Sequence, residues 1–170
     1  GYKSEILSQY LLLNHDISSL HNTIGRGNAW WLFNSLLSSI DQPVLVMTCD
    51  NIVHLDLDRL GEAYRELGSP SCMLIPVAPH DDISGDYIFS NDGLVTSLSR
   101  HEISKYYCSG IQLLNPFKIV SKLSEANYED DFSCVWNHLI RQQDLYVAPI
   151  TPSYWRSFDT VSHLSTLPND

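Results

Sequence analysis

The sequence predicts an α/β protein with a Rossmann-like, mostly parallel mixed sheet that is flanked by helices and carries one antiparallel hairpin insertion. Segments with helical spacing of apolar residues alternate with short apolar runs along the 170 residues. The run "PVLVMTCDN" at residues 43–51 is typical of a strand buried on both faces of a parallel sheet. An Asn-Asp-Gly turn at residues 91–93 joins two strand-like segments and indicates the hairpin. At this length we expect a single domain over residues 1–170.

The first half of the chain alternates between helix and strand. "SEILSQYLLL" has apolar residues at helical spacing, and "NAWWLFNSLLSSI" follows with Asn28 as a candidate N-cap. The predicted inward face of this second helix consists of Ala29, Phe33, Leu36, Leu37 and Ile40. After the strand at residues 44–49, "DLDRLGEAYREL" predicts a helix that Gly68 ends, with an apolar stripe of Leu57, Leu60, Tyr64 and Leu67. "SCMLIPVAP" predicts a second buried strand.

The second half begins with the hairpin, whose strands are "YIFS" and "LVTSLS". "YYCSGIQLLNP" predicts another strand, broken at Gly110, and Pro116 suits the first position of the helix "PFKIVSKLSEA". "LYVAPI" is the last predicted strand. Before it lies the helix "DFSCVWNHLIRQQ", with an inward face of Phe132, Val135, Trp136, Leu139 and Ile140.

Composition excludes several classes of function. The net charge is −10 and the ten Lys and Arg residues are scattered singly, so no basic patch is present to bind a nucleic acid polymer. No run of about 18 apolar residues and no signal peptide are present, so we expect a soluble, cytoplasmic protein without a membrane partner. The four cysteines lack zinc-site spacing and are expected to be buried free thiols. The histidines show no metal-site spacing and no serine lies in a GxSxG elbow, which leaves a zinc site or a hydrolase triad without support.

Asp50 is the first candidate site residue, because it ends a predicted buried strand. Ligands of open α/β sheets bind beyond the carboxyl ends of the strands, and Mg²⁺ prefers carboxylate and phosphate oxygens. The alternative is an Asx turn or a helix cap, which aspartate and asparagine supply routinely.

The segment "TIGRGNAWW" at residues 23–31 is the second candidate. Two glycines, an arginine and an asparagine precede a predicted helix, which suits close approach of the backbone to a ligand at the helix N-terminus. It matches neither a P-loop nor the GxGxxG pattern, and a tight turn with a cap explains it equally well.

The order of these segments resembles the sugar-1-phosphate nucleotidyltransferase family. "GYKSEILSQYL" is similar to a family segment that follows an early strand, and "GRGNAWWLFNSL" lies where the family has a Gly-rich helix start. "VLVMTCDN" resembles the family strand that ends in the magnesium-binding aspartate. "GDYIFSNDGLVTSL", "YYCSGIQLLNP" and "DLYVAPITPSYWRSFDTVSHL" resemble the remaining motifs, so the resemblance covers nearly the whole chain.

The resemblance implies a GT-A-like nucleotidyltransferase fold that moves a nucleotidyl group from an NTP to a sugar 1-phosphate, or to a related phosphorylated alcohol, and releases pyrophosphate. Asp50 would be catalytic and would hold the Mg²⁺ cofactor. The implied nucleotide-binding residues are Gly25, Arg26, Gly27 and Asn28. The implied sugar-binding residues are Asn51, Gly85, Asp86 and Gly110. A homo-oligomer is left open as a further partner.

Two departures from the family pattern bear on activity. The Gly-rich loop with an Arg and a Lys that grips the NTP phosphates is expected before the Gly-Tyr-Lys segment, so the domain is expected to be N-terminally incomplete, without its first strand and phosphate loop. With Trp155 aligned to the family tryptophan, Ser157 stands where a second metal-binding aspartate is expected, and Asp159 is the candidate substitute. The alternative function is a catalytically degenerate regulatory or sugar-nucleotide-binding module of the same fold.

Overall fold

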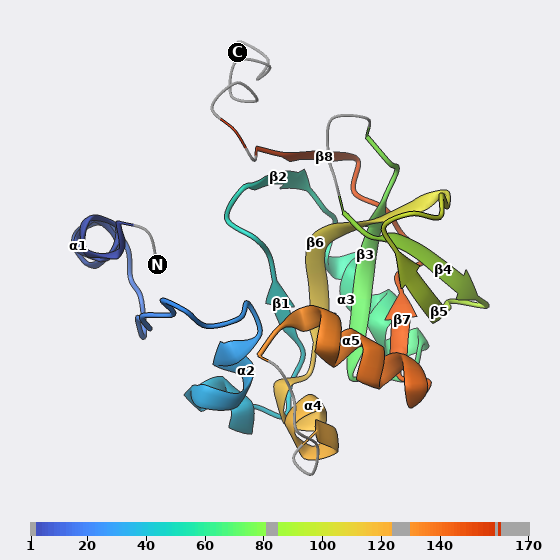
Figure 1. The fold of residues 1–170 in the computed structure, drawn as a ribbon, viewed down its shortest axis with the longest axis horizontal. Coiled ribbons are helices and arrows are strands. Elements are labelled where there is room, and N and C mark those ends of the chain that lie inside the picture. The colour runs from blue at the N-terminus through green and yellow to red at the C-terminus, as the bar shows by residue number, and fades with distance from the viewer. Residues whose placement is uncertain (1–2, 81–84, 124–129, 159, 161–170) are drawn as a thin grey trace.

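The computed structural model describes residues 3–80, 85–123, 130–158 and 160, which form a mixed six-stranded sheet, a two-stranded ribbon and flanking helices (Figure 1). The helices are α1 (Ser4–Asn14), α2 (Trp30–Asn34), the 3-10 helix η1 (Leu36–Ser39), α3 (Leu57–Glu66), α4 (Pro116–Leu123) and α5 (Phe132–Arg141). The strands are β1 (Val44–Val46), β2 (Asn51–His54), β3 (Cys72–Val77), β4 (Tyr87–Asn91), β5 (Leu94–Ser99), β6 (Tyr106–Leu114), β7 (Leu145–Val147) and β8 (Tyr154–Ser157).

The six-stranded sheet has the order β1-β6-β3-β7-β5-β4, and most of its pairings are antiparallel. The α/β class is confirmed, but the expectation of a mostly parallel sheet is wrong: among the described strands only β3 and β7 pair in parallel. β1 and β3 both run antiparallel to β6, which lies between them. The helical crossovers keep β1, β3 and β7 in one direction, and the insertion of β6 makes the neighbouring pairs antiparallel.

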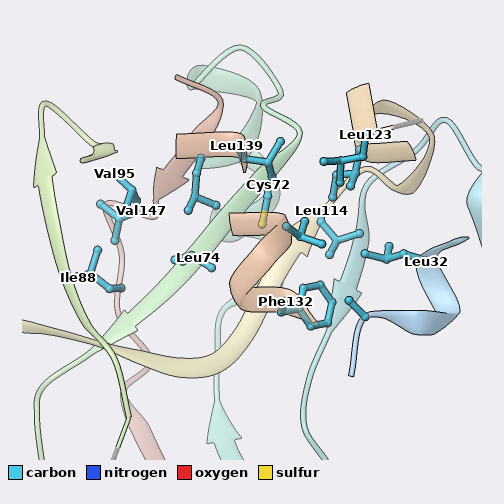
Figure 2. Packing of buried hydrophobic residues seen from close by; sticks show 14 residues of the cluster. Leu32, Cys72, Leu74, Ile88, Val95, Leu114, Leu123, Phe132, Leu139 and Val147 are labelled. Atoms are coloured by element: carbon cyan, nitrogen blue, oxygen red, sulfur yellow. The ribbon is translucent and has the colours of Figure 1, made fainter. Parts of the chain in front are cut away.

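Helices cover both faces of this sheet and create two apolar clusters. On one face α2, α4 and α5 pack over alternate residues of β3 and β6, with Leu32, Leu74, Leu114 and Leu139 all at 2% exposure or less (Figure 2). On the other face α3 contributes Leu60 and Tyr64 to a cluster with Ile75 and Ile111. The inward residues predicted for the helices at 57–67 and 132–141 largely agree with these clusters: Leu60, Tyr64, Phe132, Val135 and Leu139 are buried.

The helix predicted at residues 28–40 is broken in two. Ser35 is extended, its hydroxyl accepts from the Leu37 amide, and α2 and η1 lie on either side of it. The break rotates the second half away from the core, so Leu36 is 88% exposed and its predicted inward position is wrong. Leu32 is buried in its place.

β1 is shorter and less buried than predicted. It spans three residues, all half-buried, and stands at the edge of the sheet with β6 as its partner. A strand buried on both faces needs neighbours on both sides, and among the described strands β1 has one.

The hairpin prediction is confirmed by the backbone. Asp92 and Gly93 both have positive φ, at 48° and 82°, as a two-residue turn between β4 and β5 requires. Gly110 also has a positive φ of 80°, and the pairing of β6 with β3 changes register around it, since Leu74 pairs with Gln112 and Pro76 with Cys108. β6 continues through Gly110 as one strand, so the predicted break is a local irregularity of the pairing and not an end of the strand.

The four cysteines are free thiols, as predicted. Burial raises the pKa of Cys108 to about 12 and raises the pKa of Cys72 well above its ordinary value, so both thiols stay protonated near neutral pH. Cys49 is exposed because β1 ends at Val46, which corrects its predicted burial. No described helix is long and apolar enough to cross a membrane.

We expect Leu139→Ala to lower the free energy of unfolding by about 2–5 kcal/mol, because it leaves a cavity at a fully buried position. Leu36→Ala is the matched control, and at 88% exposure it should change stability by no more than about 0.5 kcal/mol. Urea unfolding of the two variants measures both values. Equal effects would show that the break between α2 and η1 is placed incorrectly.

Candidate functional site

Asp50 lies in the turn that connects the sheet edge with the two-stranded ribbon. β1 ends at Val46, and the Asn51 amide donates to the Thr48 carbonyl across the turn. β2 then begins at Asn51 and pairs antiparallel with β8, so that Asn51 stands opposite Ser157. The Phe158 amide donates to the Asp50 carbonyl at 2.9 Å, which extends this pairing by one residue. The ribbon was not predicted from the sequence, and it fixes the backbone of Asp50 from both sides.

Two side-chain oxygens in this turn are buried without a hydrogen-bond partner among the described residues. They are Oδ1 of Asp50 and Oδ1 of Asn51, on consecutive residues. A buried acceptor without a donor costs free energy, and native structures satisfy nearly all such atoms. Two neighbouring oxygen acceptors of this kind are suited to a cation or to the donors of a ligand.

The Asn51 side chain is held by its amide nitrogen. Nδ2 donates to Oγ1 of Thr48 and, at 3.0 Å, to the Ser109 carbonyl of β6. The same carbonyl accepts from Nε1 of Trp155 at 3.1 Å. These bonds fix which way the Asn51 amide points and direct Oδ1 away from β6.

Gly110 allows the turn to lie close to β6. A Cβ at this position would come within 3.0 Å of Oγ1 of Thr48 and 3.2 Å of Nδ2 of Asn51, and its φ of 80° disfavours any side chain. The structure therefore brings the predicted residues Asp50, Asn51 and Gly110 together around β6.

Gly85 and Asp86 come directly before β4 and lie beside β6 at Tyr107 and Cys108. The Cys108 amide donates to the Asp86 carbonyl at 2.8 Å, and a Cβ on Gly85 would come within 2.5 Å of the Tyr107 hydroxyl. The Asp86 carboxylate pairs with Arg100 at 3.3 Å. Burial, with Tyr87 and Asp86 nearby, raises the pKa of Tyr107 to about 12, so its hydroxyl remains a hydrogen-bond donor.

The "GRGN" segment packs on the N-terminus of α5. Oδ1 of Asn28 accepts from the Phe132 amide at 2.8 Å, and the Ala29 amide donates to the Asp130 carbonyl at 3.0 Å. A Cβ on Gly27 would lie 1.8 Å from that carbonyl oxygen, so this glycine is required by packing. Asn28 was predicted to cap its own helix, but Ala29 holds that position. Asn28 instead accepts from the first amide of α5, whose N-cap is Asp131.

The other two residues of this segment have open surroundings. A Cβ on Gly25 would meet no atom within 4 Å, and the Arg26 guanidinium lies 6.0 Å from the centre of the Trp30 ring. The assignment of Gly25, Arg26, Gly27 and Asn28 to nucleotide binding stays a prediction.

The candidate positions for a second metal ligand are Ser157 and Asp159. Asp159 lies outside the described residues, and Ser157 is 7% exposed opposite Asn51. Within the described part of the chain no three His, Cys, Asp or Glu side chains gather as a metal site would require. A magnesium site does not require such a group, because this ion keeps several waters and is usually bound by one or two carboxylates together with substrate phosphates, and Asp50 supplies one carboxylate.

A cavity of about 360 Å³ adjoins this region through Trp155. Among the residues that the structure describes, none that lines it is acidic, although the chain carries a net charge of −10. Two of its lining residues carry basic groups. The Lys105 ammonium lies over the Tyr106 ring, 4.5 Å from the ring centre, and the His80 ring contacts the Arg156 guanidinium. No local sequence pattern indicated this cavity, because its residues come from three separate segments: Val77, Ala78, Pro79, His80, Lys105, Tyr106, Thr151, Pro152, Ser153, Tyr154 and Trp155.

Comparison with solved structures defines the class of this fold as sugar-phosphate nucleotidyltransferase-like. One similar structure is a protein assigned as a glucose-1-phosphate thymidylyltransferase from Bacillus anthracis, in complex with sucrose, with a TM-score of 0.73 and 14% identity over 95% of this chain and 69% of that one. Another is the inositol-1-phosphate CTP transferase of T. maritima, with a TM-score of 0.68 and 16% identity over 98% of this chain and 69% of that one. No protein-family model and no curated protein sequence matches the chain. The predicted resemblance is therefore confirmed at the level of the fold.

Proposed function

We propose that this chain is a Mg²⁺-dependent nucleotidyltransferase-type protein that acts on an NTP and a sugar 1-phosphate or a related phosphorylated alcohol. One observation carries the proposal: in the turn that follows β1 of a nucleotidyltransferase-like fold, Asp50 has a buried, unpartnered carboxylate oxygen, and the next residue, Asn51, has a buried, unpartnered amide oxygen. Strand ends of this kind are where α/β sheets bind their ligands.

Asp50 would hold the metal, and Asn51 would complete the oxygen surface around it. A bound Mg²⁺ would neutralise the charge that develops on the phosphates and would orient them. The protein's own part in such chemistry is mainly positioning, since the attacking phosphate oxygen and the α-phosphorus must be held in line. The bonds from Asn51 and Trp155 to the Ser109 carbonyl provide a rigid support for that positioning.

The acceptor would lie along β6, between Gly110 and the segment of Gly85 and Asp86. The cavity next to Trp155 opens at the start of β6 and does not include Gly85, Asp86 or Gly110, but its size suits a small molecule, and its lysine, Lys105, forms no ion pair with a described carboxylate. Aromatic rings and hydroxyl groups line the same cavity and are suited to a polyhydroxylated body.

The second candidate function is a degenerate binding module, and Ser157 is the observation that favours it. A serine opposite Asn51 supplies no charge where the family resemblance implies a carboxylate. Such a module would bind a sugar nucleotide through the same surface without requiring a metal ion.

Titration of the ¹⁵N-labelled chain with each of the four NTPs, in Mg²⁺ and in EDTA, distinguishes the two candidates. The proposal expects shifts at the amides of Asn51, Gly110 and Phe158 that require Mg²⁺, and further shifts near Gly85 when a sugar 1-phosphate is added. Equal shifts in EDTA would favour the module. The absence of any shift at these amides would contradict both.

Turnover by the 170-residue chain alone is expected to be undetectable. Holding the triphosphate is the main task of the protein, and these residues contain no Gly-rich loop with an Arg and a Lys that could do it. A coupled pyrophosphate assay with each NTP and several sugar phosphates measures this. Robust release would mean that another group holds the phosphates, and Arg26→Gln would then be the first variant to assay.

A further inference from the structure

The pairing of β6 with β3 contains a bulge at Ser109 and Gly110. Three residues of β6, 109–111, stand opposite one residue of β3, Ile75. The Ser109 hydroxyl bridges the strands there: it donates to the Ile75 carbonyl at 2.7 Å and accepts from the Ile111 amide at 3.1 Å. Ser109 is 3% exposed, and Gly110 has a φ of 80°. Bulges re-orient the groups beside them and are frequent next to active sites.

The Ser109 carbonyl at this bulge accepts two side-chain donors from the ribbon of β2 and β8. Nδ2 of Asn51 donates to it at 3.0 Å, and Nε1 of Trp155 donates to it at 3.1 Å. Trp155 stands opposite Val53, which lies two residues from Asn51, so both donors are on the same face of the ribbon. One backbone carbonyl therefore connects both strands of the ribbon to β6.

This carbonyl determines which end of the Asn51 amide faces the turn. A carbonyl only accepts hydrogen bonds, so Asn51 presents Nδ2 to Ser109 and directs Oδ1 to the other side. Oδ1 of Asn51 is buried without a partner among the described residues, as is Oδ1 of the preceding residue, Asp50. Glycine populates both signs of φ, so the peptide plane between Ser109 and Gly110 is adjustable, and the two donors hold it in this orientation.

We infer that Trp155 is a positioning residue of the proposed metal site. Its indole N–H holds the Ser109 carbonyl in the orientation that turns Oδ1 of Asn51 toward a cation at Asp50. The Trp155 ring also lines the cavity of about 360 Å³, so this side chain is shared by the metal turn and the cavity. The inference rests on the proposed function for its metal ion, whereas the hydrogen bonds that fix Asn51 do not depend on it. Indole N–H groups usually find an acceptor when buried, and a role in stability alone would leave metal affinity unchanged.

The indole N–H resonances of the ¹⁵N-labelled wild type give the first test. Mg²⁺ should shift the Trp155 indole resonance with the same dissociation constant as the Asn51 amide, because coupling between two groups acts in both directions. Trp136 is the internal control, since its Nε1 donates to Oε1 of the buried Gln112 at 2.9 Å, and its resonance should not move. A Trp155 resonance that stays fixed while the Asn51 amide responds to Mg²⁺ would overturn the inference.

The variant Trp155→Phe keeps an aromatic ring and removes the donor. It should raise the dissociation constant of Mn²⁺, measured from the broadening of the Phe158 amide, by about 10-fold, the lower end of what the loss of an outer partner of a metal ligand costs. Trp136→Phe is the matched variant: it removes an indole donor from the core and should keep the wild-type affinity, whatever it does to stability. Wild-type affinity in Trp155→Phe, or an equal loss in both variants, would overturn the inference.

Hydrogen exchange of the Asn51 side-chain amide in EDTA separates this inference from the proposed function. Nδ2 donates to Oγ1 of Thr48 and to the Ser109 carbonyl, so its protons should exchange slowly in the wild type and in Trp136→Phe, and faster in Trp155→Phe. A wild type that binds no Mn²⁺ at this turn would contradict the proposed function, and this exchange would then decide whether Trp155 positions Asn51. Unchanged exchange in Trp155→Phe would overturn the inference. If Trp155→Phe does not fold, the indole shift of the wild type decides.

Discussion

Replacing Asp50 by asparagine is expected to remove metal binding at the site while leaving the fold intact. Mn²⁺, which substitutes for Mg²⁺ and broadens nearby resonances, should broaden the amides of Asn51, Gly110 and Phe158 in the wild type and not in the variant. The loss of affinity should be at least about 10–100-fold, since that much follows even the removal of a residue that only supports a ligand. The fold should tolerate the change because the Asp50 carboxylate oxygen Oδ1 bonds to no described residue, whereas its backbone carbonyl, which the variant keeps, binds Phe158.

Glu62→Gln is the matched control for this experiment. Glu62 is an exposed carboxylate on α3, and its loss should leave the Mn²⁺-dependent broadening unchanged. Broadening at Asn51 that persists in Asp50→Asn would remove Asp50 as the metal ligand. Broadening spread evenly over the acidic surface would indicate diffuse counterion binding in place of a site.

Local patterns were sufficient to predict most elements, but not their neighbours in the sheet. The apolar stripe of α3 and the Asn-Asp-Gly hairpin are encoded within a few residues, and both were predicted. The position of β6 between β1 and β3 depends on contacts between segments about 30–70 residues apart, as in the pairing of Val44 with Leu114, and no local pattern indicates it. The prediction of one continuous helix over residues 28–40 was wrong at Ser35. The helical spacing of apolar residues continues through this position, but the Ser35 side chain bonds to the backbone of Leu37 and ends the helix there.

In the candidate site, too, features encoded locally were predicted and those that depend on distant contacts were not. Asp50 and Gly110 could be proposed from the sequence, because Asp50 follows an apolar strand and Gly110 interrupts one. The structure places both residues around one turn. The packing role of Gly27 and Asn28 was not predictable, because the residues that they contact, Asp130 and Phe132, lie about 100 residues further along the chain. Glycine and asparagine before a helix suit a ligand site and a capping contact equally well, and only the fold distinguishes them.

Ser157→Asp is expected to make the stability of the chain strongly dependent on Mg²⁺. Ser157 is 7% exposed and stands opposite Asn51, next to the turn that holds Asp50. A carboxylate introduced there is desolvated and lies near a second one, so in EDTA the variant should lose about 3–5 kcal/mol of unfolding free energy. Mg²⁺ bound between the two carboxylates should return about 2.7 kcal/mol at a concentration one hundred times the dissociation constant.

Urea unfolding in EDTA measures the loss of stability, and urea unfolding in Mg²⁺ measures how much of it the metal restores. The wild type should respond weakly to the metal, since it offers one carboxylate, and the control Ser157→Asn should respond no more than the wild type because it adds bulk without charge. If Mg²⁺ restores the stability of Ser157→Asp alone, position 157 is adjacent to the metal site, and the natural serine is what weakens metal binding in this chain. If the variant is destabilised equally with and without Mg²⁺, the side chain at position 157 does not reach the metal, and the argument that Ser157 marks a degenerate site fails with it.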